Sequence, residues 1–203
     1  MADRYSRFSE LKDGEDTGAY RVVVRQTGAR VGVAAPHGGA IEPGTSEVGR
    51  AIAHDDLSLY LFEGTKANGN SDLHITSTRF DEPQCLQLLK VVEVAVTLHG
   101  EGGDREVVYL GGRNRQLGER LRSHLEPHGF LVQRHASSWL QGEDPDNICN
   151  RCASGMGVQL ELSAGLRKTF FKSLWSAAGR AHTTERFTLF GQAVRAALAS
   201  VQL

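Results

Sequence analysis

The stretch VVEVAVTLHGEGG, residues 91–103, decides the fold, because it is the most apolar run in the chain and ends in a histidine beside glycines. Such a run is typical of a strand buried on both faces of a parallel sheet. Two other stretches have the same form, RVGVAAPHGGAIEPGTSE (30–47) and GVQLELSAGLRK (157–168). Ligands bind at the carboxyl ends of strands in open α/β sheets, so the side chains at these three ends are candidates for a functional site.

Strands and helices alternate along the rest of the chain. Apolar runs predict strands at residues 20–26, 31–35, 58–62, 73–77, 91–98, 106–110, 130–134 and 157–162. Helical periodicity and capping residues predict helices at 45–54, 82–90, 114–127 and 184–201. The short connection between 58–62 and 73–77 favours an antiparallel or mixed part of the sheet. We therefore expect one domain, residues 1–203, with a three-layer α/β/α fold and a mixed, mostly parallel sheet.

Composition restricts the classes of partner. The chain has 203 residues, 40% of them hydrophobic and 23% charged, and a formal net charge of −1. This charge gives no electrostatic footprint for nucleic acid or a membrane surface. The polar N-terminus has no signal-peptide core, and three cysteines fit a reducing compartment rather than a disulfide framework. We expect a cytoplasmic monomer with neither a nucleic-acid nor a membrane partner.

Three residues at the strand ends form a candidate metal site: His37, Glu42 and His99. Two histidines and one carboxylate are a familiar ligand set for catalytic zinc, with water in the fourth position. The glycines around His37 and Glu42 permit a loop in which both side chains turn toward one point. In the alternative interpretation, His37 donates to a loop carbonyl and Glu42 caps the helix that follows.

A fourth polar residue, Glu161, alternates with leucines late in the predicted strand 157–162. An acidic side chain on an interior strand must be paired, protonated or close to an ion. We interpret Glu161 as the group that takes a proton from zinc-bound water and passes it to the leaving amine. The alternative is a structural carboxylate paired with an arginine.

Substrate-binding candidates come from polar loops. Arg151 and Arg167 are candidates for gripping a substrate carboxylate, because guanidinium pairs with carboxylate through two parallel hydrogen bonds. Asn150 would add an amide contact, and Arg79, near a predicted strand end, would line the pocket. His74 is interpreted as an ordinary strand histidine, and the CxxC thiols of 149–152 as ordinary cysteines.

Several blocks carry a resemblance to a known family. They are APHGGAIEPGTSE (35–47), LYLFEG (59–64), LHITSTRFDEP (73–83), VTLHGEGG (96–103), NICNRC (147–152) and GVQLELSAGLR (157–167). Together they resemble the poly-γ-glutamate hydrolases, a group of phage and bacterial proteins, some labelled phage-related replication proteins, that is distantly similar to zinc carboxypeptidases. The resemblance covers nearly the whole chain. Arg79 departs from the family pattern, which has a variable residue there, often His or Asn.

The resemblance implies a carboxypeptidase-like fold and a zinc-dependent amidohydrolase that cuts γ-glutamyl amide bonds in an anionic polymer. It places the zinc ligands on His37, Glu42 and His99 and the general base on Glu161. A phage-encoded copy would be released on host lysis. The alternatives are a zinc hydrolase of another acyl-amino acid or peptide, a non-catalytic replication-associated protein, and a site that holds no metal in the cell.

Overall fold

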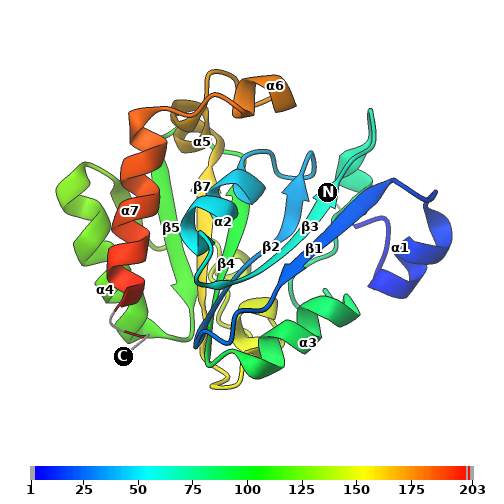
Figure 1. Cartoon of the computed structure of the whole chain (residues 1–203), viewed down its shortest axis with the longest axis horizontal. Coiled ribbons are helices and arrows are strands. Elements are labelled where there is room, and N and C mark those ends of the chain that lie inside the picture. The colour runs from blue at the N-terminus through cyan, green and yellow to red at the C-terminus, as the bar shows by residue number, and fades with distance from the viewer. Residues whose placement is uncertain (1–2, 200, 202–203) are drawn as a thin grey trace.

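A seven-stranded mixed sheet forms the centre of the computed structural model, which describes residues 3–199 and 201 (Figure 1). Its strands are β1 (Tyr20–Arg25), β2 (Val31–Gly39), β3 (Ser58–Gly64), β4 (Val94–Glu101), β5 (Val107–Gly112), β6 (Leu131–Gln133) and β7 (Val158–Ser163). They lie in the order β1-β3-β2-β4-β7-β5-β6. The four central strands β3, β2, β4 and β7 are mutually parallel, whereas β1 pairs antiparallel with β3 and β5 antiparallel with β7. The prediction of a mixed, mostly parallel sheet is confirmed.

Helices cover both faces of this sheet. They are α1 (Phe8–Gly14), α2 (Thr45–Ala53), α3 (Pro83–Val91), α4 (Arg115–Leu125), α5 (Ala164–Phe170), α6 (Ala177–Arg180) and α7 (Glu185–Ala199). Short 3-10 helices lie in the connections between these helices and the strands: η1 (Asn70–Leu73), η2 (Glu126–His128), η3 (Ser138–Leu140) and η4 (Ile148–Arg151). No helix among residues 3–199 is both long enough and apolar enough to cross a membrane.

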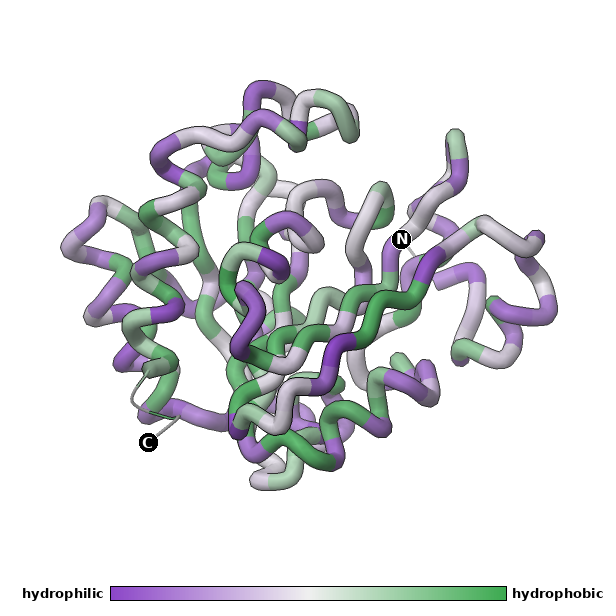
Figure 2. Tube along the Cα trace, in the orientation of Figure 1, coloured by the Kyte–Doolittle hydropathy of each residue, from purple (hydrophilic) through white to green (hydrophobic). Residues whose placement is uncertain are grey.

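The alternation of side chains along the strands separates two apolar cores. On β3, Leu59 and Leu61 belong to the core that α2, α4, α5 and α7 cover. Tyr60 and Phe62 point to the opposite face and pack in the core that α1 and α3 cover. Hydrophobic segments accordingly concentrate along the central strands in Figure 2, with polar segments toward the periphery. Helix, sheet and helix thus form three layers.

One predicted element is wrong. Residues 73–77 form no strand; η1 ends at Leu73, and an irregular segment follows. The Asp3 carboxylate accepts a hydrogen bond from the Thr76 backbone N–H at 2.7 Å, so a side chain takes a donor that a neighbouring strand would have used. The antiparallel pairing expected for this segment therefore does not exist. Elsewhere the predicted and observed elements differ mainly at their ends, and the prediction omitted α1, α5 and α6.

Candidate metal centre and its cavity

The candidate ligands meet where the central strands separate. β2 and β4 pair only as far as Ala34 and Thr97, and His37 and His99 lie just beyond that point. The Nδ1 atoms of the two histidines are 3.1 Å apart. Glu42 completes the group, with Oε1 3.2 Å from His37 Nδ1 and Oε2 3.8 Å from His99 Nδ1. One ligand atom from each residue lies within 4.8 Å of the others, a spacing that can hold a metal ion.

A tight glycine turn brings Glu42 back to His37. The Glu42 N–H donates to the His37 carbonyl at 2.9 Å, which closes the turn. Gly39 within it has a φ of +65°, and a Cβ there would lie 2.5 Å from the Gly64 carbonyl oxygen on β3. Only glycine satisfies both conditions without strain. The GG pair in the sequence is therefore a requirement of the site geometry.

A hydrogen bond at Nε2 of His37 leaves the Nδ1 lone pair of this ring facing the other two candidate ligands. Its Nε2 lies 2.8 Å from the Ile75 carbonyl oxygen, which can only accept, so Nε2 carries the proton. In the neutral ring, Nδ1 then presents its lone pair to Glu42 and His99. The loop-carbonyl contact considered as an alternative is thus present, and it orients the ring as metal-binding histidines usually are oriented. His99 Nε2 has no hydrogen-bond partner among the described residues.

Electrostatics in the centre favour an ionised Glu42, which raises the pKa of His37 against the effect of burial, beside a neutral His99. Burial would raise the pKa of Glu42, but His37 outweighs it and lowers the pKa to about 2. Burial lowers the pKa of His99 to about 3, despite the opposing effect of Glu42. Two imidazole nitrogens and a carboxylate facing one point are the donor set that zinc and similar divalent ions accept. The residues present therefore fit a metal ion.

Glu161 lies beside this centre on β7, where it is the register partner of His99 on β4. Its Oε1 accepts a hydrogen bond from Gln159 Nε2 at 2.9 Å. Burial raises the pKa of Glu161 well above its usual value, and Glu42 and Glu101 add to the effect. No ion pair with an arginine holds it in the described part of the chain, contrary to the structural alternative. A bound cation would lower this pKa again.

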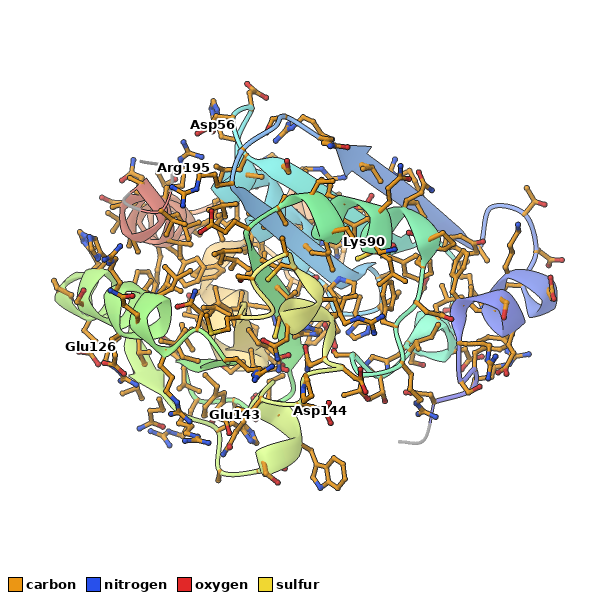
Figure 3. The ribbon with its side chains drawn as sticks, turned by 90° about the horizontal axis from the view of Figure 1, so that it is seen from below. Asp56, Lys90, Glu126, Glu143, Asp144 and Arg195 are labelled. Carbon is orange, nitrogen blue, oxygen red and sulfur yellow. The ribbon has the colours of Figure 1, made fainter. Side chains whose placement is uncertain are left out.

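A cavity of about 780 Å³ opens over these four residues. Its walls include the hydroxyl-rich segment 76–78 and the loop 138–147. Figure 3 labels two members of that loop, Glu143 and Asp144. Five acidic residues line the cavity, and no arginine or lysine of the described chain does. They are Glu42, Glu101, Glu143, Asp144 and Glu161.

Sequence analysis missed one member of the site, His74. Its ring centroid lies 4.0 Å from that of His37, and its Nε2 is 3.9 Å from Glu42 Oε1. Asp3 Oδ1 is 2.7 Å from His74 Nδ1 and so orients the ring. The sequence analysis placed His74 inside a strand and therefore did not assign it to the site. No local sequence pattern indicates its contact with Asp3, which lies 71 positions away.

The structure does not bring the four predicted substrate-binding residues into this cavity. Arg167 is buried and donates to three backbone carbonyls, those of Leu162, Pro43 and Glu101. Asn150 is also buried, and its Nδ2 donates to backbone carbonyls of the loop 142–144.

The other two predicted residues, Arg79 and Arg151, line a separate depression of about 430 Å³. Arg79 also forms an ion pair with Asp3 at 3.0 Å.

Fold and site together define an α/β protein with a candidate metal centre at the carboxyl edge of its sheet. The family model described as "Poly-gamma-glutamate hydrolase" matches residues 5–193, and the chain belongs to this family. It is 43% identical over 190 residues to the UPF0714 protein YndL of Bacillus subtilis (strain 168), covering 93% of this chain and 75% of YndL. The prophage-derived YoqZ of the same organism is 40% identical over 88% of this chain, which spans 65% of YoqZ.

Two solved structures are similar over almost their whole length. A bacteriophage poly-γ-glutamate hydrolase superposes with a TM-score of 0.94 at 38% identity, covering 98% of each chain. YndL in an apo form described as zinc-free also gives a TM-score of 0.94 at 38% identity, with 100% of both chains covered. The resemblance noted from the sequence blocks is confirmed at the level of the family.

Proposed function

We propose that the protein is a zinc-dependent amidohydrolase that cleaves the γ-glutamyl amide bonds of poly-γ-glutamate. One observation carries the proposal: two buried imidazoles and a carboxylate face one point, with a second buried carboxylate beside them in an open cavity. Membership of the poly-γ-glutamate hydrolase family supports the substrate. The description of the YndL structure as zinc-free supports zinc as the ion.

His37, Glu42 and His99 would hold the ion at the wall of the cavity. A zinc ion held there would supply a Lewis acid for the scissile carbonyl and would lower the pKa of a bound water molecule. The Ile75 carbonyl keeps the proton of His37 on Nε2 and so keeps Nδ1 free for the ion.

Glu161 would move the proton. It takes a proton from the attacking water and then donates it to the nitrogen of the leaving α-amino group, so that the C–N bond breaks without expelling an amide anion. Burial raises the pKa of this carboxyl, and the positive ion opposes that increase. Gln159, which donates to Oε1, holds the carboxyl in place through the exchange.

The test combines metal content with polymer cleavage. Purified wild type should contain one equivalent of zinc by elemental analysis and should shorten poly-γ-glutamate in gel filtration. His99→Ala should lose both the zinc and the activity. His128→Ala, an exposed histidine on η2, is the matched control and should retain both. Intact polymer after incubation with the zinc-loaded wild type would reject the proposed substrate.

A further inference from the structure

The acidic cavity presents a difficulty for an anionic substrate. Every unit of a γ-linked glutamate chain carries a free carboxylate, but the cavity walls carry five acidic residues and no arginine or lysine of the described residues. Of the five, Glu143 is paired with Arg115 and Arg134 from outside the lining. The ion can neutralise charge only at the reacting unit. Carboxylates of the neighbouring units must therefore be met outside the cavity.

A cationic depression lies next to the cavity and shares a wall with it. Thr78 lines both spaces, so a chain that leaves the cavity over Thr78 enters the depression directly. The other residues lining the depression are Ser6, Arg7, Arg79, Phe80, Asp81 and Arg151.

Three segments far apart in the sequence build this depression, and hydrogen bonds fix them together. The Phe8 N–H donates to Asp81 Oδ1 at 2.6 Å, which ties the N-terminal segment to residues 80–81. The Ile148 N–H donates to the Ser77 carbonyl at 2.9 Å, which ties η4 to the segment before Thr78. The backbones that carry the arginines are thus held in place before any ligand arrives.

Its guanidinium groups are available to a ligand to different degrees. Arg151 is exposed and makes no ion pair or side-chain hydrogen bond with the described residues. The Arg7 side chain is 63% exposed, with Glu10 at 3.5 Å, and Glu10 already accepts hydrogen bonds from Ser6.

The remaining charges leave the depression cationic. Arg79 is 52% exposed and is anchored by Asp3. Asp81 is the one acidic residue of the lining, and its Oδ1 accepts the Phe8 N–H. The lining thus has three arginines and one carboxylate, and Glu10 and Asp3 pair with Arg7 and Arg79 from outside it, which leaves Arg151 as the unpaired cation among the described residues of the lining.

We propose that this depression is a distal binding site for the free carboxylates of poly-γ-glutamate units that extend from the cavity over Thr78. The inference rests on the proposed function and adds a second point of contact to it. Guanidinium groups pair with carboxylates through two parallel hydrogen bonds, and a polymer offers such carboxylates at regular intervals. Engagement of two sites by one chain raises the affinity for long substrates above that for short ones.

The test compares substrates of different length. In the double variant Arg7→Ala/Arg151→Ala, KM for the polymer should rise about twofold to tenfold with kcat unchanged, since exposed ion pairs are individually weak. KM for a γ-linked glutamate dimer, which has no unit beyond the two that the scissile bond joins, should change by less than about a factor of two. Arg79 is left intact because its partner Asp3 also orients His74.

Salt and a matched variant separate a specific site from general charge loss. The difference between wild type and the double variant should largely vanish at about 0.5 M NaCl, where charges are screened over a few ångströms. Lys90→Ala removes an exposed positive charge from the end of α3 (Figure 3), at a residue that lines neither the cavity nor the depression. Its KM for the polymer should equal that of wild type. An unchanged KM in the double variant, or an equal rise in Lys90→Ala, would overturn the proposal.

Direct binding keeps this proposal distinguishable from the proposed function. Fluorescence anisotropy of labelled poly-γ-glutamate with zinc-loaded Glu161→Gln measures binding without turnover. Weaker binding after the two arginine substitutions would support the distal site even if the wild type failed to cleave the polymer. Equal binding with and without Arg7 and Arg151 would overturn it, whatever the catalytic result.

Discussion

Arg167 provides a strong test of how the site is held together, because it is a buried cation bonded to backbone carbonyls. Its guanidinium donates to Leu162 at the end of β7 (3.0 Å), to Pro43 after Glu42 (2.6 Å) and to Glu101 at the end of β4 (2.9 Å). It therefore joins the strand ends and the loop that carry the candidate metal centre. We predict that Arg167→Met destabilises the protein and weakens zinc binding together.

The magnitude follows from the three acceptors that the substitution leaves without a partner. A buried acceptor that loses its donor costs about 1–3 kcal/mol, and some acceptors recover a water molecule, so a total of about 3–5 kcal/mol is expected. The guanidinium also lies where a Cβ on Gly100 would be, 2.7 Å from Arg167 Cζ, so the shorter Met side chain leaves space there. Arg167→Lys should recover only part of the loss, because one ammonium cannot reach three carbonyls in the same geometry.

Two assays read out this prediction. Urea unfolding of the metal-free protein gives the change in the free energy of unfolding, and titration with zinc against a competing chelator gives the change in affinity. Arg105→Met, an exposed arginine, is the control and should change neither. A loss of stability below about 1 kcal/mol, or full stability loss with unchanged zinc affinity, would refute the account of Arg167.

Three further predictions concern other parts of the structure. Glu161→Gln should retain zinc and lose polymer cleavage by about 10²-fold or more in kcat, and activity near wild type would remove Glu161 from the proton transfer. Gly39→Ala should lower the midpoint of unfolding and weaken zinc binding, because its φ is +65° and its Cβ would lie 2.5 Å from the Gly64 carbonyl; an unaltered midpoint contradicts this. Burial would raise the pKa of Glu63, but Arg50 and Arg21 outweigh it and lower the pKa to about 2. Because this folded-state pKa lies below the unfolded value of 4.5, the stabilisation is present above pH 4.5 and disappears as the pH falls toward 2. The stability difference between wild type and Glu63→Gln in urea should thus shrink between pH 6 and pH 3, and a constant difference would show that the ion pairs are not its cause.

Local sequence was sufficient for the central strands of the sheet and for the location of the site. Apolar runs with polar ends identified β2, β4 and β7, and parallel strands place their carboxyl ends at one edge. That geometry brings His37, His99 and Glu161 together, as the sequence led us to expect. Glycines near His37 indicated a loop that folds back on itself, and Gly39 has the positive φ that such a loop needs.

Long-range contacts account for what the sequence did not reveal. LHITS has the composition of a strand, but Asp3 binds the Thr76 N–H and orients His74. Arg167 follows β7, and its position in the sequence suggested that it binds a substrate carboxylate. In the structure its guanidinium instead occupies the space beside Gly100, where a Cβ would lie. In both cases a partner more than 60 positions away decides the role, and neither periodicity nor spacing carries that information.

Locating the zinc ion is the most direct measurement of the central claim. A crystal of the zinc-loaded protein, with anomalous data collected on both sides of the zinc edge, shows where the ion lies. The account predicts one peak at about 2.0–2.2 Å from the Nδ1 atoms of His37 and His99 and from the Glu42 carboxylate, with Glu161 beside it. A peak at other residues, or none between these three at full zinc occupancy, would contradict the account.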